Sequence, residues 1–247
     1  GLAMADSSAF MAGPPKQNRP AEQREANRAR KFRPALANGR AARNARAWHT
    51  DTMPRTIAIV QGHPDPQPVH LGHALAGAYG RGAREGGHVV RAIQVADLEF
   101  PLLRSARAWN DEPPPDGLRE AGEILRTADH VALFFPLWLG TMPAVVKAFL
   151  EQTLRPGLAF HRDDPARGWR PALRGKSARV VVTMGMPSWV YRWVYLAHGV
   201  RGLERNILGF CGFKPVRETL LGGVERGGPR RHRRWLDEVY RLGVSGR

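Results

Sequence analysis

The chain has 247 residues, a formal net charge of +16 and 43% hydrophobic residues, which is enough to bury one good core in one or two domains. A single cysteine excludes an internal disulfide framework and agrees with a reducing compartment. The longest apolar run, residues 131–139, is too short to span a membrane, so we expect a soluble, cytoplasmic protein. The arginines accompany no helix-turn-helix, zinc-finger or aromatic-plus-basic pattern, and we expect no specific nucleic-acid binding.

The composition changes near residue 53. Residues 1–52 contain repeated Asn, Ala and Arg and almost no larger aliphatic side chain, so this segment cannot bury enough apolar area to offset its ordering entropy. We expect a disordered basic extension, with a weak helix over residues 21–33, and a folded domain over residues 53–247. The extension has three interpretations: a cloning remnant, translation from too early a start, with Met53 as the natural beginning, or a basic targeting segment.

From residue 55 onward, short apolar strands alternate with helical patterns. The pattern predicts strands over residues 56–61, 88–95, 131–135, 178–183 and 216–221, and helices over residues 71–84, 118–126, 142–154, 200–210 and 231–242. This alternation is typical of a doubly wound α/β sheet with both faces covered. Right-handed crossovers leave few strand orders, and we expect five parallel strands in the order 2-1-3-4-5, in three layers. Ligands of such sheets bind at the carboxyl edge, where the strand order reverses.

The loop after the first strand, residues 62–70, opens into a helix N-terminus, whose unpaired amides and positive dipole end attract phosphate. His63 and His70 could add donors. The glycines and the lysine of the Walker and dinucleotide motifs are missing, so a proline-stiffened turn with surface histidines is the alternative. His63, His70 and His73 could instead hold a metal, but no acidic or thiol ligand at matching spacing supports a closed site, and we expect no metal.

The loop after the third strand contains Pro136, Leu137, Trp138 and Leu139, followed by Gly140. Core packing is the alternative for Trp138 and Leu139. Large apolar residues beside Pro and Gly, beyond the end of a buried strand, are nevertheless oddly placed for core. We interpret this loop as a flat apolar surface on which a planar aromatic ligand stacks.

The loop after the fourth strand contains Thr183, Met184, Gly185 and Met186. Gly185 lets the backbone approach the edge of a ring closely, because a glycine carries no side chain there. Amides near Gly185 could then bind carbonyl oxygens of a ligand.

An aromatic-rich stretch lies just downstream and contains Trp189, Tyr191, Trp193 and Tyr195, with His198 at its end. Core or a dimer interface is the expected place of most of this stretch. Tyr191 and His198 are the candidates for polar groups that act next to a bound ligand.

Three of these features together resemble one family. They are His63-Pro64 after the first strand, the run FPLWLGTMPAVVKAF with the RPGLAF that follows it, and Thr-Met-Gly after the fourth strand. They are similar to the flavodoxin-like NAD(P)H dehydrogenase (quinone) family, over Arg55 to Gly222. That family includes quinone reductases, modulator of drug activity proteins and ancillary subunits of glutathione-gated potassium efflux.

The resemblance implies a flavodoxin-like homodimer with FAD or FMN in each carboxyl-edge site and NAD(P)H as reductant. It implies two-electron hydride transfer through flavin N5 to a quinone-like acceptor. By position, His63 resembles the flavin-phosphate histidine, residues 136–139 the loop that packs on the isoalloxazine, and residues 183–185 the loop at its pyrimidine edge. Tyr191 resembles a substrate-side tyrosine, and His198 a histidine that balances charge on the reduced flavin.

The chain departs from the family pattern at two places. Pro68, Val69 and His70 stand where the family has Ser-x-Asn, and Gly185-Met186 stands where it has Gly-Gly. Both changes leave the flavin type and the substrate size open. Two other classes also stay open: a flavin-binding regulatory subunit with little turnover, and a flavin-free protein on the same scaffold. Azo or nitro reduction by the same flavin is a further variant.

Two remaining features have plainer interpretations. Residues 230–234 (RRHRR) could attract a cofactor phosphate, but they open a helix, where the dipole disfavours cations, so solvent or a partner surface explains them better. Cys211 has no basic neighbour and no partner cysteine, and we expect an inert packing residue.

Overall fold

The computed structural model describes residues 53–161 and 168–247, and the expectations for residues 1–52 lie outside the described residues. The main sheet contains β1 (Thr56–Gln61), β2 (Val89–Gln94), β3 (His130–Pro136), β6 (Ser177–Met184) and β7 (Val216–Gly222). A separate antiparallel pair joins β4 (Phe160–His161) to β5 (Arg170–Pro171). The α-helices are α3 (Leu71–Glu85), α4 (Ala106–Asn110), α5 (Arg119–Thr127), α6 (Ala144–Thr153), α7 (Ser188–Trp193), α8 (His198–Gly202) and α9 (Gly228–Val244).

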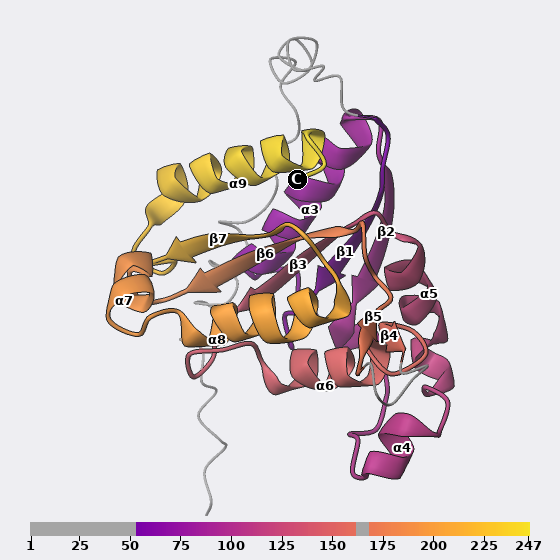
Figure 1. Cartoon of the computed structure of the whole chain (residues 1–247). Coiled ribbons are helices and arrows are strands. Elements are labelled where there is room, and N and C mark those ends of the chain that lie inside the picture. The colour runs from indigo at the N-terminus through magenta and orange to yellow at the C-terminus, as the bar shows by residue number, and fades with distance from the viewer. Residues whose placement is uncertain (1–52, 162–167) are drawn as a thin grey trace, which may run out of the picture. The chain divides into compact units, whose positions relative to one another are not determined.

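The five main strands are all parallel and lie in the order β2-β1-β3-β6-β7. This order confirms the predicted doubly wound sheet. Gln61 at the end of β1 pairs with Phe134 of β3, and Pro136 at the end of β3 pairs with Thr183 of β6. The carboxyl ends of these three strands therefore meet at one edge of the sheet, the edge toward which the arrows point in Figure 1.

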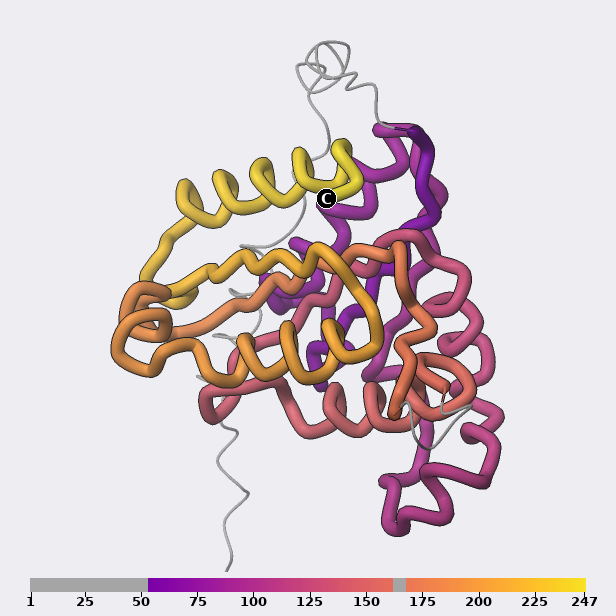
Figure 2. The backbone as a smooth tube through the Cα atoms, viewed as in Figure 1, coloured from indigo at the N-terminus to yellow at the C-terminus, as the bar shows by residue number. Residues whose placement is uncertain are grey.

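Helices cover both faces of the sheet, as Figures 1 and 2 show: α3 and α9 lie on one face, and α5, α6 and α8 on the other. β1 and β3 are buried along almost their whole length because both faces are covered. Phe134 and Phe149 are among the largest fully buried side chains, and each such side chain contributes about 2 kcal/mol of hydrophobic stabilisation.

The contact between α3 and α9 depends on glycines in both helices. A Cβ at Gly82 would clash with the carbonyl oxygen of Tyr240, and a Cβ at Gly243 would clash with that of Tyr79. The two backbones approach closely only because neither position carries a side chain. This packing fixes α9 beside α3 on the same face of the sheet.

The structure differs from the predicted elements mainly at their ends. The predicted helix over residues 200–210 begins earlier, at His198, and continues as the π-helical segment η5 (Leu203–Gly209). The second strand begins at Val89, because His88 still belongs to the turn and donates its backbone N–H to Ala83 O, 2.9 Å away. The short elements α4, β4, β5 and α7 were not predicted, since they are too short to show a period.

Two further observations concern burial. Cys211 is free and buried, and burial raises the pKa of its thiol to about 12, which confirms an inert packing residue. In residues 53–161 and 168–247, no helix combines the length and the apolar character that crossing a bilayer requires.

Candidate functional site

The three predicted loops leave neighbouring strands at the carboxyl edge. Gly62 N donates to Phe134 O at 2.7 Å, which ties the first loop to β3, and Leu137 N donates to Thr183 O at 2.8 Å, which ties the second loop to β6. A Cβ at Gly62 would lie 2.7 Å from Val146 Cγ2, so the first loop also presses on α6. The loops that the sequence predicts as ligand-binding therefore leave the sheet next to one another, along its carboxyl edge.

The second loop is a tight hairpin. Trp138 and Thr141 exchange both backbone hydrogen bonds, at 2.9 and 3.0 Å, and Leu139 and Gly140 between them have φ angles of 47° and 81°. Positive φ at both central residues defines a type I′ turn. Leu139 is fully exposed and Trp138 is 51% exposed, which confirms that neither side chain is core. A left-handed conformation costs a non-glycine residue such as Leu139 about 1 kcal/mol of conformational energy. The turn is therefore strained, and it presents apolar side chains to solvent.

The buried side chain of Tyr191 supports this hairpin through hydrogen bonds. Its hydroxyl donates to Gly140 O at 2.9 Å and accepts from Val200 N at 3.2 Å, and the side chain is 1% exposed. Burial raises the pKa of Tyr191. A Cβ at Gly199 would clash with Gly140 O, so α8 also presses on the turn. In this arrangement Tyr191 fixes the position of the hairpin. His198 is exposed and comes directly before Gly199, the residue that contacts the hairpin.

The first loop gathers three histidines around Asp65. Asp65 O lies 3.0 Å from His63 Nδ1 and 2.9 Å from His73 Nε2, and its carboxylate lies 2.6 Å from His70 Nε2. The His63 and His70 rings stack with centroids 4.0 Å apart. In the part of the chain that the structure describes, no group of His, Cys, Asp or Glu has an arrangement that could hold a metal ion.

The electrostatics of this loop follow from burial and from the Asp65–His70 pair. Burial, followed by the nearby His70, lowers the pKa of His63, so His63 is neutral near pH 7 and has one donor nitrogen. The hydrogen bond from His70 lowers the pKa of Asp65, which therefore stays ionised. The negative carboxylate is held against His70, while His63 stands next to the start of α3.

The start of α3 has donors that the protein leaves open. Its N-cap residue, His70, makes no side-chain capping bond, and its first turn contains no acidic residue. Gln61 Nε2 is buried and lacks a hydrogen-bond partner among the described residues, although Gln61 Oε1 accepts from His63 N at 2.9 Å. A Cβ at Gly72 in the first turn would lie 3.9 Å from the Gln61 amide. An unfilled helix N-terminus beside a buried free donor is suited to an anion.

The third loop is fixed on one side and open on the other. Met184 O accepts from Val224 N at 3.1 Å, and Met186 O accepts from Gly223 N at 2.9 Å, so the segment after β7 clamps the loop. Gly185 between them is exposed, and a Cβ there would meet nothing within 4 Å. The backbone at Gly185 is thus accessible to a flat ligand that lies along this edge.

The sequence did not single out Gln61, Asp65 or Gly199 as site residues. Asp65 had a detectable signal, because an Asp before Pro favours a turn in which its carboxylate accepts from the amide two residues on, here Gln67 N at 2.9 Å. Gln61 and Gly199 had no local signal. The role of Gly199 depends on its contact with Gly140, which is distant in the chain.

Comparison with known proteins gives the class to which this geometry belongs. A family model described as flavodoxin-like fold matches residues 55–241, and the chain belongs to that family. The family assignment confirms the resemblance and the fold predicted from the sequence.

Individual relatives agree with this class. The chain is 24% identical over 198 residues to an FMN-dependent NADH:quinone oxidoreductase of Nitratidesulfovibrio vulgaris, a match that covers 70% of this chain and 89% of the relative. The NAD(P)H:quinone oxidoreductase of Methanothermobacter marburgensis has a similar structure, with a TM-score of 0.65, 22% identity and coverage of 78% and 96%. An FMN-dependent NADH-azoreductase of Bacillus anthracis, solved with FMN, has a TM-score of 0.60, 13% identity and coverage of 76% and 97%.

Proposed function

We propose that the chain is a flavin-dependent NAD(P)H:quinone oxidoreductase that holds FMN or FAD at the carboxyl edge of its sheet. The observation that carries the proposal is the meeting of an anion-binding loop, an exposed apolar hairpin and an open glycine backbone at one sheet edge. A phosphorylated flat ring system needs these three kinds of surface together. The quinone oxidoreductase names of two relatives support the same reaction class.

The first loop fits the phosphate end of the cofactor. The α3 N-terminus offers amides without a side-chain cap, Gln61 Nε2 offers a buried donor, and His63 offers a ring nitrogen. Pro68 and Val69 stiffen the segment that leads into α3. They stand where related loops have a hydroxyl donor, and neither side chain can donate a hydrogen bond. In this proposal the His63 ring supplies part of that donor set, because the Nε2 atoms of His70 and His73 already face Asp65.

The other two loops fit the ring. Residues 136–139 present Trp138 and Leu139 as a rigid apolar support, since the hairpin beneath them is held by Tyr191. Residues 183–186 present the accessible Gly185 backbone, whose amide side suits the polar edge of a flavin. Backbone donors stabilise the negative charge that grows on that edge during reduction.

When bound, the flavin supplies two-electron hydride transfer between a nicotinamide and a quinone, while the protein supplies position and electrostatics. Trp138 and Leu139 exclude water from the face on which they pack. His198 is exposed and is the neighbour of Gly199, which contacts the hairpin. We assign His198 the role of balancing the negative charge on the reduced flavin. We assign Tyr191 a positioning role, because its hydroxyl is already bonded to Gly140 O and Val200 N.

We also infer a homodimer, as the resemblance implies. One surface that suits a partner copy is an apolar groove of about 650 Å³ between α4, α6 and η5, which Trp109, Phe160 and Phe210 line. Light scattering of the purified protein measures the mass directly, and a monomer at micromolar concentration would contradict the inference.

Anaerobic spectroscopy tests the proposed function. The purified protein is reconstituted with FMN, NADPH or NADH is added, and a short-chain benzoquinone follows. We expect the flavin absorbance to disappear with the nucleotide and to return with the quinone. Flavin that binds but does not bleach would favour the regulatory class, and no flavin uptake would favour the flavin-free class. An azo dye in place of the quinone separates azo from quinone reduction.

A paired substitution localises the cofactor. His63→Ala should weaken FMN binding about tenfold, which is the effect of losing one charge-assisted hydrogen bond. His161→Ala is the matched control, because His161 is exposed on β4, outside the three loops. Equal FMN affinity of the two variants would contradict the assignment of the first loop.

A further inference from the structure

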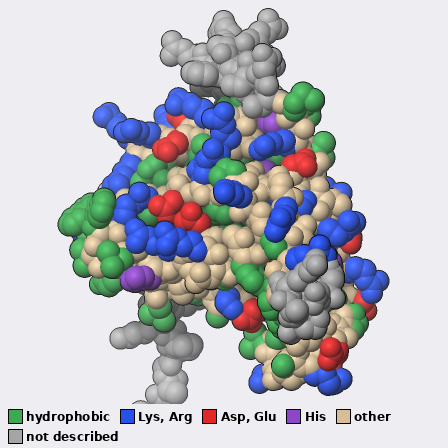
Figure 3. Space-filling model, viewed as in Figure 1, with side chains coloured by type: hydrophobic (Ala, Val, Ile, Leu, Met, Phe, Trp, Pro, Cys, Tyr) green, Lys and Arg blue, Asp and Glu red, His purple; other side chains and the backbone are tan. Residues whose placement is uncertain are grey.

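The largest group of exposed apolar side chains in the described chain lies at α7 and the turn that follows it. Five large side chains there are between 45% and 71% exposed, and we call them the aromatic shoulder: Trp189, Trp193, Val194, Tyr195 and Leu196. Figure 3 shows hydrophobic side chains massed at the end of the molecule where α7 lies in Figure 1. Core packing is excluded for most of this stretch, since only Tyr191 of its aromatic side chains is buried, while the dimer interface that the sequence also indicates stays a prediction. A contiguous exposed apolar patch of this kind marks an interaction surface.

The aromatic shoulder is held firmly next to the candidate site. A Cβ at Gly222 would clash with Ser188 N, so the end of β7 packs directly on the start of α7. Arg192 forms an ion pair with Glu218 of β7 at 2.6 Å. Tyr191, within the same helix, donates to Gly140 O of the hairpin. The shoulder therefore continues the apolar surface of Trp138 and Leu139 along the rim of the site.

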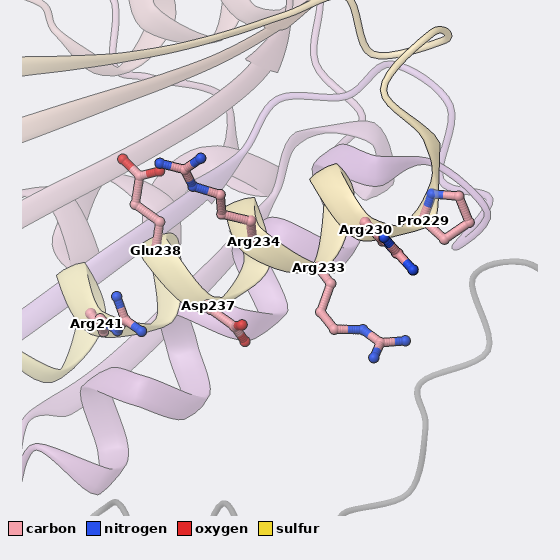
Figure 4. A pocket seen from close by; sticks show the side chains of 7 residues that line it. All are labelled: Pro229, Arg230, Arg233, Arg234, Asp237, Glu238 and Arg241. Atoms are coloured by element: carbon pink, nitrogen blue, oxygen red, sulfur yellow. The ribbon is translucent and has the colours of Figure 1, made fainter.

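A basic surface begins at the same end of the molecule. The loop before α9 is bonded to Met184 and Met186, so α9 starts beside α7, at the carboxyl edge in Figure 1. A shallow depression of about 630 Å³ lies on α9 (Figure 4). Its lining is Pro229, Arg230, Arg233, Arg234, Asp237, Glu238 and Arg241. Figure 4 shows Arg234 turned toward Glu238, while Arg233 extends into open space.

The position of Arg230 and Arg233 near the start of α9 does not stabilise the helix through its dipole. The first turn of α9 contains no acidic residue, and cations at a helix N-terminus oppose the macrodipole. Arg230 and Arg233 are both exposed. Their charge is complementary to an anionic surface, and the net charge of +16 acts in the same direction.

We propose that the chain docks on an anionic lipid bilayer through the aromatic shoulder and the arginines of α9, and that its acceptor is a quinone dissolved in that bilayer. Trp and Tyr favour the interface between headgroups and acyl chains, and arginines favour anionic headgroups. The second half rests on the proposed function. NAD(P)H gives a hydride, the solvent gives a proton, the lipid quinone becomes the quinol, and NAD(P)⁺ leaves.

Vesicle flotation tests the docking. The full chain is mixed with vesicles of phosphatidylcholine alone or of phosphatidylcholine and phosphatidylglycerol in equal parts. We expect flotation with the anionic vesicles and a loss of it at high salt, because exposed charges are screened. The double variant Trp189→Ser/Trp193→Ser should bind about tenfold more weakly. Arg230→Gln/Arg233→Gln should lose about fivefold in affinity for each arginine.

The matched control is Val89→Ser/Leu102→Ser. Val89 and Leu102 are each 59% exposed and lie outside the aromatic shoulder, and this variant should float like the unchanged chain. All variants keep residues 1–52, so any contribution of that basic segment is equal in every sample. Loss of binding in the arginine variant but not in the tryptophan variant would identify a general polyanion surface and overturn the proposal. So would cross-linking of Trp193→Cys copies into a dimer without vesicles.

The activity readout separates this inference from the proposed function. Reduction of a water-soluble short-chain quinone should be unchanged in the tryptophan variant, while reduction of a long-chain quinone in anionic vesicles should fall about tenfold. Normal short-chain activity without vesicle binding overturns the docking and leaves the oxidoreductase. Vesicle binding without activity on either quinone retains the docking and overturns the oxidoreductase.

Discussion

The two edges of the sheet both carry histidines, yet they differ in what those histidines bind. At the amino edge, His88 Nε2 lies 3.3 Å from Val244 O, and His130 Nδ1 lies 2.8 Å from Ser177 Oγ. Arg55 closes the same edge by donating to Gly246 O at 3.1 Å. At the carboxyl edge, the three histidines of the first loop surround Asp65 and leave the start of α3 uncapped.

This difference shows that residue type alone does not define a site. The amino edge also has buried donors or acceptors without a partner among the described residues, His130 Nε2 and Arg179 Nε. Both side chains are covered by protein, so the consequence is a depressed pKa of His130 rather than a surface for a ligand. The carboxyl edge instead combines unfilled donors with exposed apolar side chains and a left-handed turn.

The largest expected effect comes from a substitution that disturbs only the carboxyl edge. Gly199→Ala places a methyl group against Gly140 O and Thr141, which displaces the hairpin. We expect a loss of about 100-fold in quinone reductase kcat/KM, equivalent to about 3 kcal/mol.

Gly202→Ala is the control for this substitution, since it lies in the same helix and its Cβ would meet nothing within 4 Å. It should keep full activity and gain up to about 1 kcal/mol of stability. Equal activity of the two alanine variants would show that the hairpin does not need its support.

The second effect concerns the amino edge and depends on pH. Burial, with help from Arg55 and Arg179, lowers the pKa of His130 to about 3 from an ordinary 6.5. Below pH 6.5 the unfolded chain binds a proton that the folded chain refuses, so stability should fall by about 1.4 kcal/mol per pH unit as the pH drops toward 3. Urea unfolding of the unchanged chain and of His130→Leu at pH 7, 6 and 5 measures the difference. An identical pH slope in both proteins would exclude His130 as the cause.

The third effect tests whether Tyr191 positions the hairpin or acts on the substrate. Tyr191→Phe removes a buried hydroxyl that bridges Gly140 O and Val200 N, and it should lower activity about tenfold through a displaced loop. FMN affinity should weaken together with kcat, and the pH profile of kcat should keep its shape. A changed pH profile with unchanged FMN affinity would make Tyr191 a catalytic residue instead.

The smallest effect concerns the strained turn. Leu139→Gly removes a side chain from a left-handed position and should stabilise the fold by up to about 1 kcal/mol. It also removes the most exposed apolar side chain of the hairpin, so affinity for an aromatic acceptor should fall about threefold. A thermal unfolding curve measures the gain in stability, and KM for the acceptor measures the loss of affinity. A lower unfolding temperature of Leu139→Gly would show that Leu139 is not strained.

The strand order and the three loops could be predicted because both depend on local pattern. Apolar runs predict the strands, and the carboxyl end of each strand predicts where a ligand loop lies. The support of the site could not be predicted in this way. Tyr191 reaches Gly140 across 51 residues of chain, and Gly199 meets the same turn only after α8 has packed. The Leu139 conformation likewise depends on the paired backbone of Trp138 and Thr141.

Hydrogen–deuterium exchange with and without FMN tests the central claim most directly. If one cofactor is clasped at the carboxyl edge, FMN should slow exchange in residues 62–73, 136–141 and 183–187 together. Peptides that contain His88, His130 and Ser177 at the amino edge should exchange as before. Protection confined to one of the three loops, or protection at the amino edge, would contradict the account.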